Sequence, residues 1–298
     1  MYIYMNGNIV HQSQASISPF DHGYLYGLGV FETFRTYDGH PFLLGDHVSR
    51  LKQGLGALAI EMDIHLDEVT EIVRTLLKKN GLEDAYCRLN VSGGPGEIGL
   101  RTTPYEQGTI ILFQKALPAP SPLREKEGVV LRLRRSTPEI DVRLKSHHYL
   151  NNLAAKREIG PSADQEGIFL TADGYVCEGI TSNIFWVKGG ELYTPSVETG
   201  LLDGITRRFI LASAQRLNIP VHEGLFKVSD LNSSDELFFT NSVQEIIPVN
   251  RVGDRCFPGK SGTYTRQLHE HYQRYVTHLD FIEEMEGGNQ HAGDDYMR

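Results

Sequence analysis

Cysteine is scarce in this sequence. Its 298 residues contain only Cys87, Cys177 and Cys256. A set that is odd in number and widely spaced gives neither a disulfide framework nor a CxxC metal site. Cys87 and Cys177 lie in apolar segments of strand-like composition, so we expect buried thiols there. Free thiols are typical of a reducing compartment, and we therefore expect a cytoplasmic protein.

Long apolar runs are also missing. No stretch approaches the ~20 residues that a transmembrane helix requires. Residues 1–7 lack the basic and apolar regions of an export signal. The 38 acidic residues outnumber the 29 Lys and Arg residues, giving a net charge of -9 that disfavours nucleic acid and acidic membranes as partners. We expect a soluble protein with a small-molecule substrate.

Two common nucleotide-binding patterns are absent. No GxxxxGK[ST] loop occurs, and the Gly-Gly-Pro-Gly segment at 93–96 contains a proline and precedes no predicted helix. Nicotinamide and nucleoside triphosphates are therefore disfavoured. The histidines include two close pairs, at 147 and 148 and at 269 and 271. Neither pair has the four-residue spacing of a helical zinc site, so a metal centre has weak support.

The length is sufficient for two domains. Three prolines within 118–122 are typical of an extended linker. We therefore expect a small N-terminal domain over 1–117 and a larger C-terminal domain over 123–285. The glycine-rich, polar residues 286–298 have the composition of a disordered tail.

Hydrophobic periodicity predicts both strands and helices. Apolar or alternating segments predict strands at 2–5, 29–37, 86–91, 109–117, 129–134, 167–170, 182–187, 191–194 and 237–240. Apolar residues at helical spacing predict helices at 46–58, 67–79, 150–159, from 204 onward, and at 264–285. We therefore expect an α+β or mixed α/β fold.

The segment 178–207 is rich in small, polar and turn-forming residues. It begins at Glu178 and ends where Gly204 introduces an apolar-periodic helix. The first N–H groups of a helix are free and lie at the positive end of its dipole, so the start at Ile205 and Thr206 is suited to a phosphate. A carboxylate and a phosphate-binding helix start in one short segment indicate a phosphorylated ligand held at both ends.

Three charged residues narrow the nature of this ligand. Burial beside apolar or cationic groups would lower the pKa of the Lys145 amine and make it a nucleophile for a carbonyl carbon. Glu178 would keep a heterocyclic nitrogen protonated, as an electron-sink cofactor requires. Arg50 offers a bidentate phosphate contact. Alone, each has an ordinary alternative: a surface lysine, which position by itself favours, a strand-end carboxylate, or a solvated arginine. Together with the helix start, they indicate pyridoxal 5'-phosphate.

The same segments resemble the class-IV (fold type IV) pyridoxal-phosphate enzymes. Residues 178–207 resemble the signature of this family, and residues 21–35 and 47–51 resemble its N-terminal pattern. The resemblance extends over about residues 2–275. The family comprises branched-chain aminotransferases, D-amino-acid aminotransferases and 4-amino-4-deoxychorismate lyases. Membership implies a two-domain fold like that of D-amino-acid aminotransferase, and a homodimer with the cofactor between the two domains.

The resemblance also implies roles for individual residues. Lys145 would be the Schiff-base lysine, and Glu178 would be the partner of the pyridine nitrogen. Leu202 would pack on the pyridine face, while Tyr149 would hydrogen-bond the phenolic oxygen of the cofactor. The phosphate would lie among Arg50, Ile205, Thr206, Asn241 and Ser242. Thr33 is a candidate active-site hydroxyl from its place in the motif.

Residues outside the shared signature bear on the reaction. D-amino-acid aminotransferases bind the substrate carboxylate with an arginine and a histidine, which correspond here to Ile98 and Leu100, and their tyrosine is replaced by Phe31. We therefore do not expect a D-amino-acid substrate. Three segments most resemble Bacillus-type 4-amino-4-deoxychorismate lyases: 18–27, 143–153 and 239–248. Those lyases form 4-aminobenzoate and pyruvate for folate synthesis.

Two alternatives stay open. An aminotransferase acting on branched-chain or other L-amino acids would share every cofactor contact named above. A non-enzymatic binding protein with a degenerate site would share the fold without the reaction. Bound cofactor excludes the second alternative, and transfer of an amino group to 2-oxoglutarate identifies the first.

Overall fold

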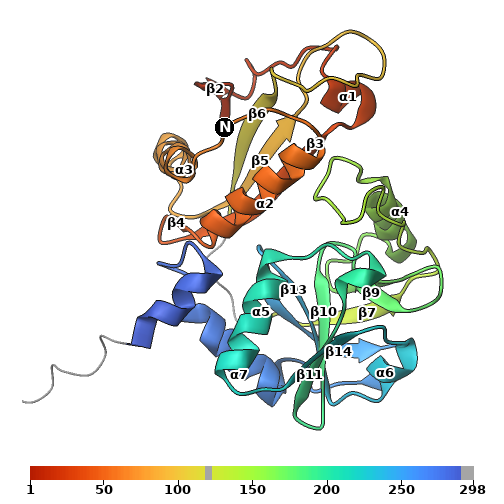
Figure 1. Cartoon of the computed structure of the whole chain (residues 1–298). Helices are drawn as coiled ribbons and strands as arrows, with labels where there is room; N and C mark the ends of the chain where they lie inside the picture. The colour runs from red at the N-terminus through yellow and green to blue at the C-terminus, as the bar shows by residue number, and fades with distance from the viewer. Residues whose placement is uncertain (118–122, 290–298) are drawn as a thin grey trace, which may run out of the picture.

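Two β-sheets, each with its own helices, form the framework of the molecule (Figure 1). The computed structural model describes residues 1–117 and 123–289. The expected linker at 118–122 lies outside the described residues, between β6 (Thr109–Ala116) and β7 (Lys126–Val130). Residues 290–298 of the expected tail lie outside them too. The domain boundary therefore stays a prediction.

The N-terminal sheet has six strands in the order β2-β1-β6-β5-β3-β4, and all neighbours are antiparallel. Its strands besides β6 are β1 (Tyr2–Met5), β2 (Asn8–His11), β3 (Gly29–Tyr37), β4 (His40–Pro41) and β5 (Ala85–Ser92). Its helices are α1 (His22–Tyr26), α2 (Leu44–Ala57) and α3 (Leu66–Asn80). This part of the molecule supplies one wall of the site described below.

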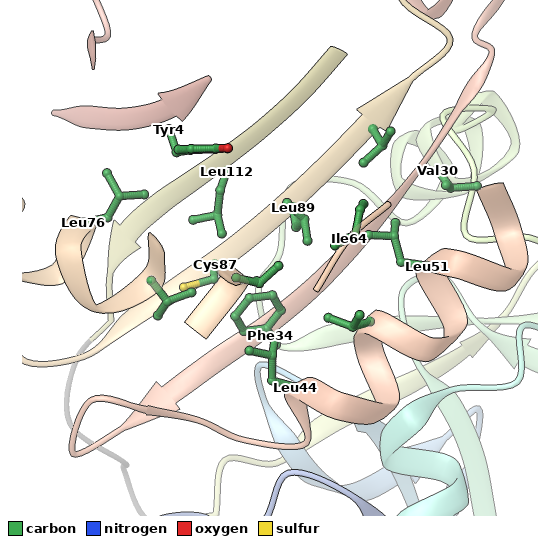
Figure 2. Close-up of a cluster of buried hydrophobic side chains, with 14 of the residues drawn as sticks. Tyr4, Val30, Phe34, Leu44, Leu51, Ile64, Leu76, Cys87, Leu89 and Leu112 are labelled. Atoms are coloured by element: carbon green, nitrogen blue, oxygen red, sulfur yellow. The ribbon is translucent and has the colours of Figure 1, made fainter. Parts of the chain in front are cut away.

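The core of the N-terminal part forms where the apolar faces of α2 and α3 pack against the apolar face of the sheet. In β5, alternate residues such as Cys87 and Leu89 are buried, as period two dictates for one face of a sheet. Leu44 and Leu51 lie on one face of α2 and pack toward Phe34 of β3 (Figure 2). Each large apolar side chain removed from water contributes about 1.5–3 kcal/mol. The sheet and its two long helices therefore hold β3 and β5 rigidly.

The C-terminal sheet has nine strands: eight follow the path β12-β11-β10-β13-β14-β7-β8-β9, and β15 pairs with β14 outside this path. Its pairs are mixed, because β7 runs parallel to β8 and β14 and β11 runs parallel to β12. The strands besides β7 are β8 (Gln165–Leu170), β9 (Val176–Gly179), β10 (Asn183–Lys188), β11 (Glu191–Pro195), β12 (Val221–Gly224), β13 (Glu236–Asn241), β14 (Glu245–Val252) and β15 (Arg255–Cys256). The helices are α4 (Leu150–Ile159), η1 (Val197–Thr199), α5 (Ile205–Arg216), α6 (Val228–Asn232), η2 (Gly259–Ser261), α7 (Thr263–Gln273) and η3 (Ile282–Asn289).

The prediction of a single helix over 264–285 is wrong. Helix α7 ends at Gln273, and the chain then turns back before η3. The turn brings this segment to the N-terminal part, beside β4 in Figure 1, where the Leu279 carbonyl accepts the Leu43 N–H at 2.9 Å. Any side chain at Gly45 would clash with the Phe281 ring. Tertiary packing thus overrides the helical pattern. Helix η3 extends to Asn289, and the tail expected over 286–298 stays a prediction.

One predicted strand is shifted along the chain, and one long strand has no prediction. The strand expected at 129–134 lies instead at Lys126–Val130, because pairing with β8 and β14 fixes its register. Strand β14 was not predicted, since Glu245, Pro248 and Asn250 interrupt its apolar pattern. The other predicted strands and helices begin and end within two residues of the observed ones, apart from the helix expected from 204, which begins at Ile205. The mixed helix-and-sheet fold is confirmed, and no helix in the described ranges has the length and apolar composition to cross a membrane.

Candidate active site

A cavity of about 340 Å³ is lined by residues from both sheets. Strand β3 contributes Phe31 and Thr33, while the segments around β9 and α5 contribute residues from the C-terminal part. All ten residues that the sequence predicts for the site line this cavity: Thr33, Arg50, Lys145, Tyr149, Glu178, Leu202, Ile205, Thr206, Asn241 and Ser242. The fold therefore brings together residues from six separate segments, and their contacts with a ligand stay predictions.

Lys145 lies in the irregular segment before α4. Its carbonyl accepts the Phe31 N–H at 2.8 Å, which fixes the backbone against β3. The Nζ atom lies 4.8 Å from the centre of the Phe31 ring. Removal from water and the positive charge of Arg50 lower the pKa of Lys145 to about 8. About a tenth of this amine is therefore neutral and nucleophilic at pH 7, far more than of an ordinary lysine.

Arg50 projects from α2 and is held by a buried carboxylate. Glu32 accepts hydrogen bonds from Arg50 Nε at 2.8 Å and Nη2 at 2.6 Å, and Nη1 donates to the Asp203 carbonyl at 2.9 Å. His47 Nδ1 lies 2.6 Å from the same Glu32 carboxylate. Burial raises the pKa of Glu32, but the charge and hydrogen bonds of Arg50 outweigh it and bring the pKa to about 2. Sequence reasoning gave Glu32 no role, although an acid within an apolar strand was a usable signal.

The start of α5 is shaped to approach an anion. Among the described residues, no side chain caps this helix, whose N-cap is Gly204. A Cβ atom on Gly204 would clash with Asn183 Oδ1, so any larger residue there would displace the Asn183 side chain. The hydroxyls of Thr206 and Ser242 lie 3.2 Å apart beside this start. Free N–H groups, a positive dipole end and two hydroxyls together form a site suited to phosphate.

Asn241 forms the turn that carries Ser242. Its Oδ1 accepts the N–H groups of Val243 at 3.0 Å and Gln244 at 2.7 Å. The side-chain oxygen is thus occupied by its own turn, as is typical of asparagine in this position. Arg35 of β3 donates to the Val243 carbonyl at 3.1 Å and fastens the turn to the N-terminal sheet.

Glu178, one residue before the end of β9, is a buried carboxylate between two guanidinium groups. Arg135 Nε donates to Oε1 at 2.7 Å, and Arg143 Nε lies 3.9 Å from the same oxygen. The other oxygen accepts the Leu202 N–H at 3.0 Å. The carboxylate is therefore fixed in orientation at the cavity wall. Sequence reasoning missed Arg135 and Arg143, since both lie in an irregular segment far from Glu178 along the chain.

Positive charge predominates in the cavity. The lining cations are Arg50, Arg88, Arg135, Arg143 and Lys145, against the acids Glu139 and Glu178. The guanidinium of Arg88 stacks 3.7 Å from the centre of the Phe31 ring, and its Nε donates to Asn90 Oδ1 at 2.8 Å. Such a cavity favours ligands with several negative charges.

Tyr149 and the two neighbouring histidines lie at or near the cavity, whereas the two positions compared with D-amino-acid aminotransferases lie outside it. Tyr149 precedes α4, and its ring meets Phe31 edge-on at 5.7 Å between centroids; burial raises the pKa of its hydroxyl. His148 lines the cavity, while His147 stacks on Phe31 and is kept neutral by burial, which lowers its pKa to about 4. Ile98 and Leu100 are 75% and 90% exposed and contribute nothing to the cavity lining.

Comparisons with known proteins agree with this arrangement. Residues 29–252 match the model of the amino-transferase class IV family. The chain is 46% identical to aminodeoxychorismate lyase of Bacillus subtilis, over 93% of this chain and 95% of the relative. It is 38% identical to a putative branched-chain-amino-acid aminotransferase of Methanocaldococcus jannaschii, over 92% and 96%. The solved branched-chain aminotransferase of the archaeon Thermoproteus uzoniensis superimposes with a TM-score of 0.84 at 28% identity, over 95% and 97%. This chain therefore belongs to the class IV aminotransferase family.

Proposed function

We propose that this protein is a pyridoxal-phosphate-dependent lyase that converts 4-amino-4-deoxychorismate to 4-aminobenzoate and pyruvate, a step of folate synthesis. The observation that carries the proposal is the position of Lys145 in a cationic cavity, where burial and nearby positive charge lower the pKa of its amine. The similarity to the Bacillus subtilis lyase favours this reaction over amino-group transfer.

The lining residues fit pyridoxal 5'-phosphate at each of its polar groups. The uncapped start of α5 and the hydroxyls of Thr206 and Ser242 would hold the phosphate. Glu178 would hold the ring nitrogen, and Lys145 would bind the aldehyde carbon. When bound, the cofactor would supply an electron sink for the substrate carbon that carries the amine.

The proposed substrate carries two carboxylates, one on its ring and one on its enolpyruvyl group. The lining carries five cationic side chains and two acids, and Arg50 is also paired with Glu32. The positive charge that remains in excess suits a substrate with two carboxylates and a cofactor phosphate. Arg88, already stacked on Phe31, is placed to bind one of them through its terminal N–H groups, which donate to no acceptor in the described part of the chain. An amino-acid substrate with a single carboxylate would neutralise less of the positive charge of the cavity than a substrate with two carboxylates.

Lys145 would carry out the proton transfers. Its Nζ would remove the proton from the amine-bearing ring carbon. The C–O bond to the enolpyruvyl group then breaks, the ring becomes aromatic, and the departing enolate takes that proton at its methylene carbon to become pyruvate. The Thr33 hydroxyl lines the same cavity and would hydrogen-bond the substrate during these steps.

The decisive experiment supplies the purified protein with 4-amino-4-deoxychorismate and follows 4-aminobenzoate fluorescence and pyruvate together. We expect both products in equal amounts. Transfer of the amino group to 2-oxoglutarate, without pyruvate release, would instead identify an aminotransferase. A visible absorbance band from the lysine-bound cofactor, lost on borohydride reduction, would exclude the non-enzymatic binding protein.

Two variants test the assigned roles. Lys145→Ala should remain folded, and its kcat should fall by about 10²–10⁴-fold or more, because both proton transfers depend on one amine. Glu178→Gln should also remain folded and lose most activity, since its amide no longer favours a protonated ring nitrogen. Full activity in Lys145→Ala would refute the mechanism.

We also propose that the protein is a cytoplasmic homodimer. Large apolar side chains are exposed around α1 and in the loop between β5 and β6, among them Phe20, Tyr24 and Leu100 at 51%, 71% and 90%. The Tyr26 hydroxyl accepts the Gly99 N–H at 2.7 Å and holds the two segments together. Burial of such a patch against a second copy would remove it from water. Sedimentation of the protein and of a Leu100→Glu variant tests this, with a shift to monomer expected in the variant.

A further inference from the structure

Gln244 is an exposed residue at the cavity wall whose amide oxygen is held by hydrogen bonds. Gln244 lies in the turn between β13 and β14 and lines the cavity. Its Oε1 lies 3.1 Å from Lys126 Nζ and 3.4 Å from Asn241 Nδ2. An ammonium group only donates hydrogen bonds, so the atom facing it must be the amide oxygen. The Nε2 group therefore faces away from Lys126, and within residues 1–117 and 123–289 it donates to no protein acceptor.

The lysine behind this amide belongs to a buried network. Lys126 and Glu166 are 9% and 5% exposed, and Lys126 Nζ lies 3.4 Å from Glu166 Oε2. The other Glu166 oxygen accepts the Thr181 N–H at 3.1 Å and the Ser182 hydroxyl at 2.8 Å. A Cβ atom on Gly179 would lie 2.9 Å from the same oxygen. One ion pair thus ties together two turns that line the cavity.

Such a network contributes little net stability. Desolvation of both charges offsets most of their attraction, and apolar replacements of buried pairs are often neutral or stabilising. A role in positioning side chains is therefore the better account of why Lys126 stands behind Gln244. The ammonium draws electron density toward Oε1 and strengthens Nε2 as a donor. A donor of this kind favours an anionic acceptor, because charge-assisted hydrogen bonds are roughly twice as strong as neutral ones.

We propose that Gln244 determines substrate specificity by donating a hydrogen bond from Nε2 to a carboxylate of the substrate, and that Lys126 and Glu166 are positioning residues that hold it there. The carboxylate is that of the ring or that of the enolpyruvyl group. The substrate identity rests on the proposed lyase function. The recognition of a carboxylate by Gln244 rests only on the geometry of the cavity.

The first test is Gln244→Glu, which keeps the shape and replaces the donor with an oxygen. Lys126 still binds the inner oxygen, and the outer one now repels a carboxylate. Loss of a hydrogen bond to a charged group corresponds to about tenfold or more in affinity. We expect KM for 4-amino-4-deoxychorismate to rise at least about tenfold and kcat to stay within about twofold, since Gln244 touches no reacting atom. Gln244→Leu should show a smaller rise in KM.

The second test does not require turnover. Binding of 4-hydroxybenzoate, lactate or neutral 4-hydroxybenzamide to the cofactor-loaded protein is followed by the change in visible absorbance. If Gln244 binds the ring carboxylate, we expect Gln244→Glu to weaken the binding of 4-hydroxybenzoate. If it binds the enolpyruvyl carboxylate, the binding of lactate should weaken instead. The affinity for 4-hydroxybenzamide should not change in either case. Unchanged affinity for both carboxylates would overturn the proposal. If the wild-type protein lacks lyase turnover, the proposed function fails, and this titration still decides the role of Gln244.

The positioning role is tested by the double variant Lys126→Met/Glu166→Gln, which leaves no charge unpaired. Its KM should rise as in Gln244→Leu, and combination with Gln244→Leu should cause no further rise, because the network acts through that amide. Independent, additive effects would show that the network is merely structural. Glu127→Gln is the matched control, since Glu127 lies next to Lys126 in β7 but pairs with Arg251 at the surface. Its KM should equal that of the wild type.

Discussion

Arg50 binds Glu32 through two parallel hydrogen bonds, from Nε to Oε1 at 2.8 Å and from Nη2 to Oε2 at 2.6 Å. The pair joins α2 to β3 beneath the cavity, and His47 completes it from the next turn of the helix toward the N-terminus. A bidentate contact fixes both the position and the plane of a guanidinium group. Glu32, which contributes nothing to the cavity surface, therefore sets the orientation of Arg50, which lines the cavity.

Glu32→Gln should destabilise the protein at neutral pH. The folded pKa of about 2 lies below the value of 4.5 for an unperturbed glutamate, so this carboxylate contributes stability above pH 4.5 and loses it as pH falls through about 2. The contribution is of the order of 3 kcal/mol. Urea unfolding at pH 7 and pH 3 should show the wild-type advantage shrinking at the lower pH. A constant difference would contradict the assignment.

Attachment of pyridoxal 5'-phosphate to Lys145 of the apoprotein should accelerate with pH and level off above about 8. Only the neutral amine is nucleophilic, and burial with the charge of Arg50 lowers the pKa of Lys145 to that value. Arg88 acts in the same direction, so Arg88→Met should move the midpoint of the rate profile upward. Arg101→Met is the control, because Arg101 stacks on Tyr105 outside the cavity. Identical midpoints in all three proteins would be inconsistent with this electrostatic account.

Gly204→Ala should weaken cofactor binding and cost about 1–3 kcal/mol of stability, because the new methyl group meets Asn183 at the start of α5. Gly56→Ala is the matched control. Gly56 lies in α2 with open space around its Cα atom, and alanine there should stabilise the helix by about 0.5–1 kcal/mol. Thermal unfolding and cofactor titration measure both effects. Equal behaviour of the two variants would show that the approach to Asn183 is unimportant.

One thiol of three should react rapidly with a thiol reagent in the native protein. Cys256 is exposed, whereas Cys87 and Cys177 are buried. Burial raises the pKa of both buried thiols to about 12, which removes the reactive thiolate as well as access. Labelling before and after denaturation should therefore give one and then three equivalents. Rapid loss of two or more native thiols would contradict the packing around β5 and β9.

Cofactor-site candidates were accessible from the sequence because their signals are local. Glu178, Gly204 and Thr206 lie in one run whose spacing marks a carboxylate and a helix start. Lys145 and Arg50 were candidates from their own chemistry, and the resemblance to class IV enzymes then implied their roles. All of these residues line one cavity. Positions without a local signal were missed, as Arg135 and Arg143 illustrate beside Glu178.

The sequence by itself determined most helices and strands, since periodicity of apolar residues is a property of a short segment. It also determined the family, through motifs whose residues are close along the chain. Only the tertiary structure decided where α7 ends, because Leu279 and Phe281 pack against a segment more than two hundred residues away. It alone placed Lys126 behind Gln244, 118 residues apart. Contacts of this kind depend on the summed geometry of many elements, which no local pattern records.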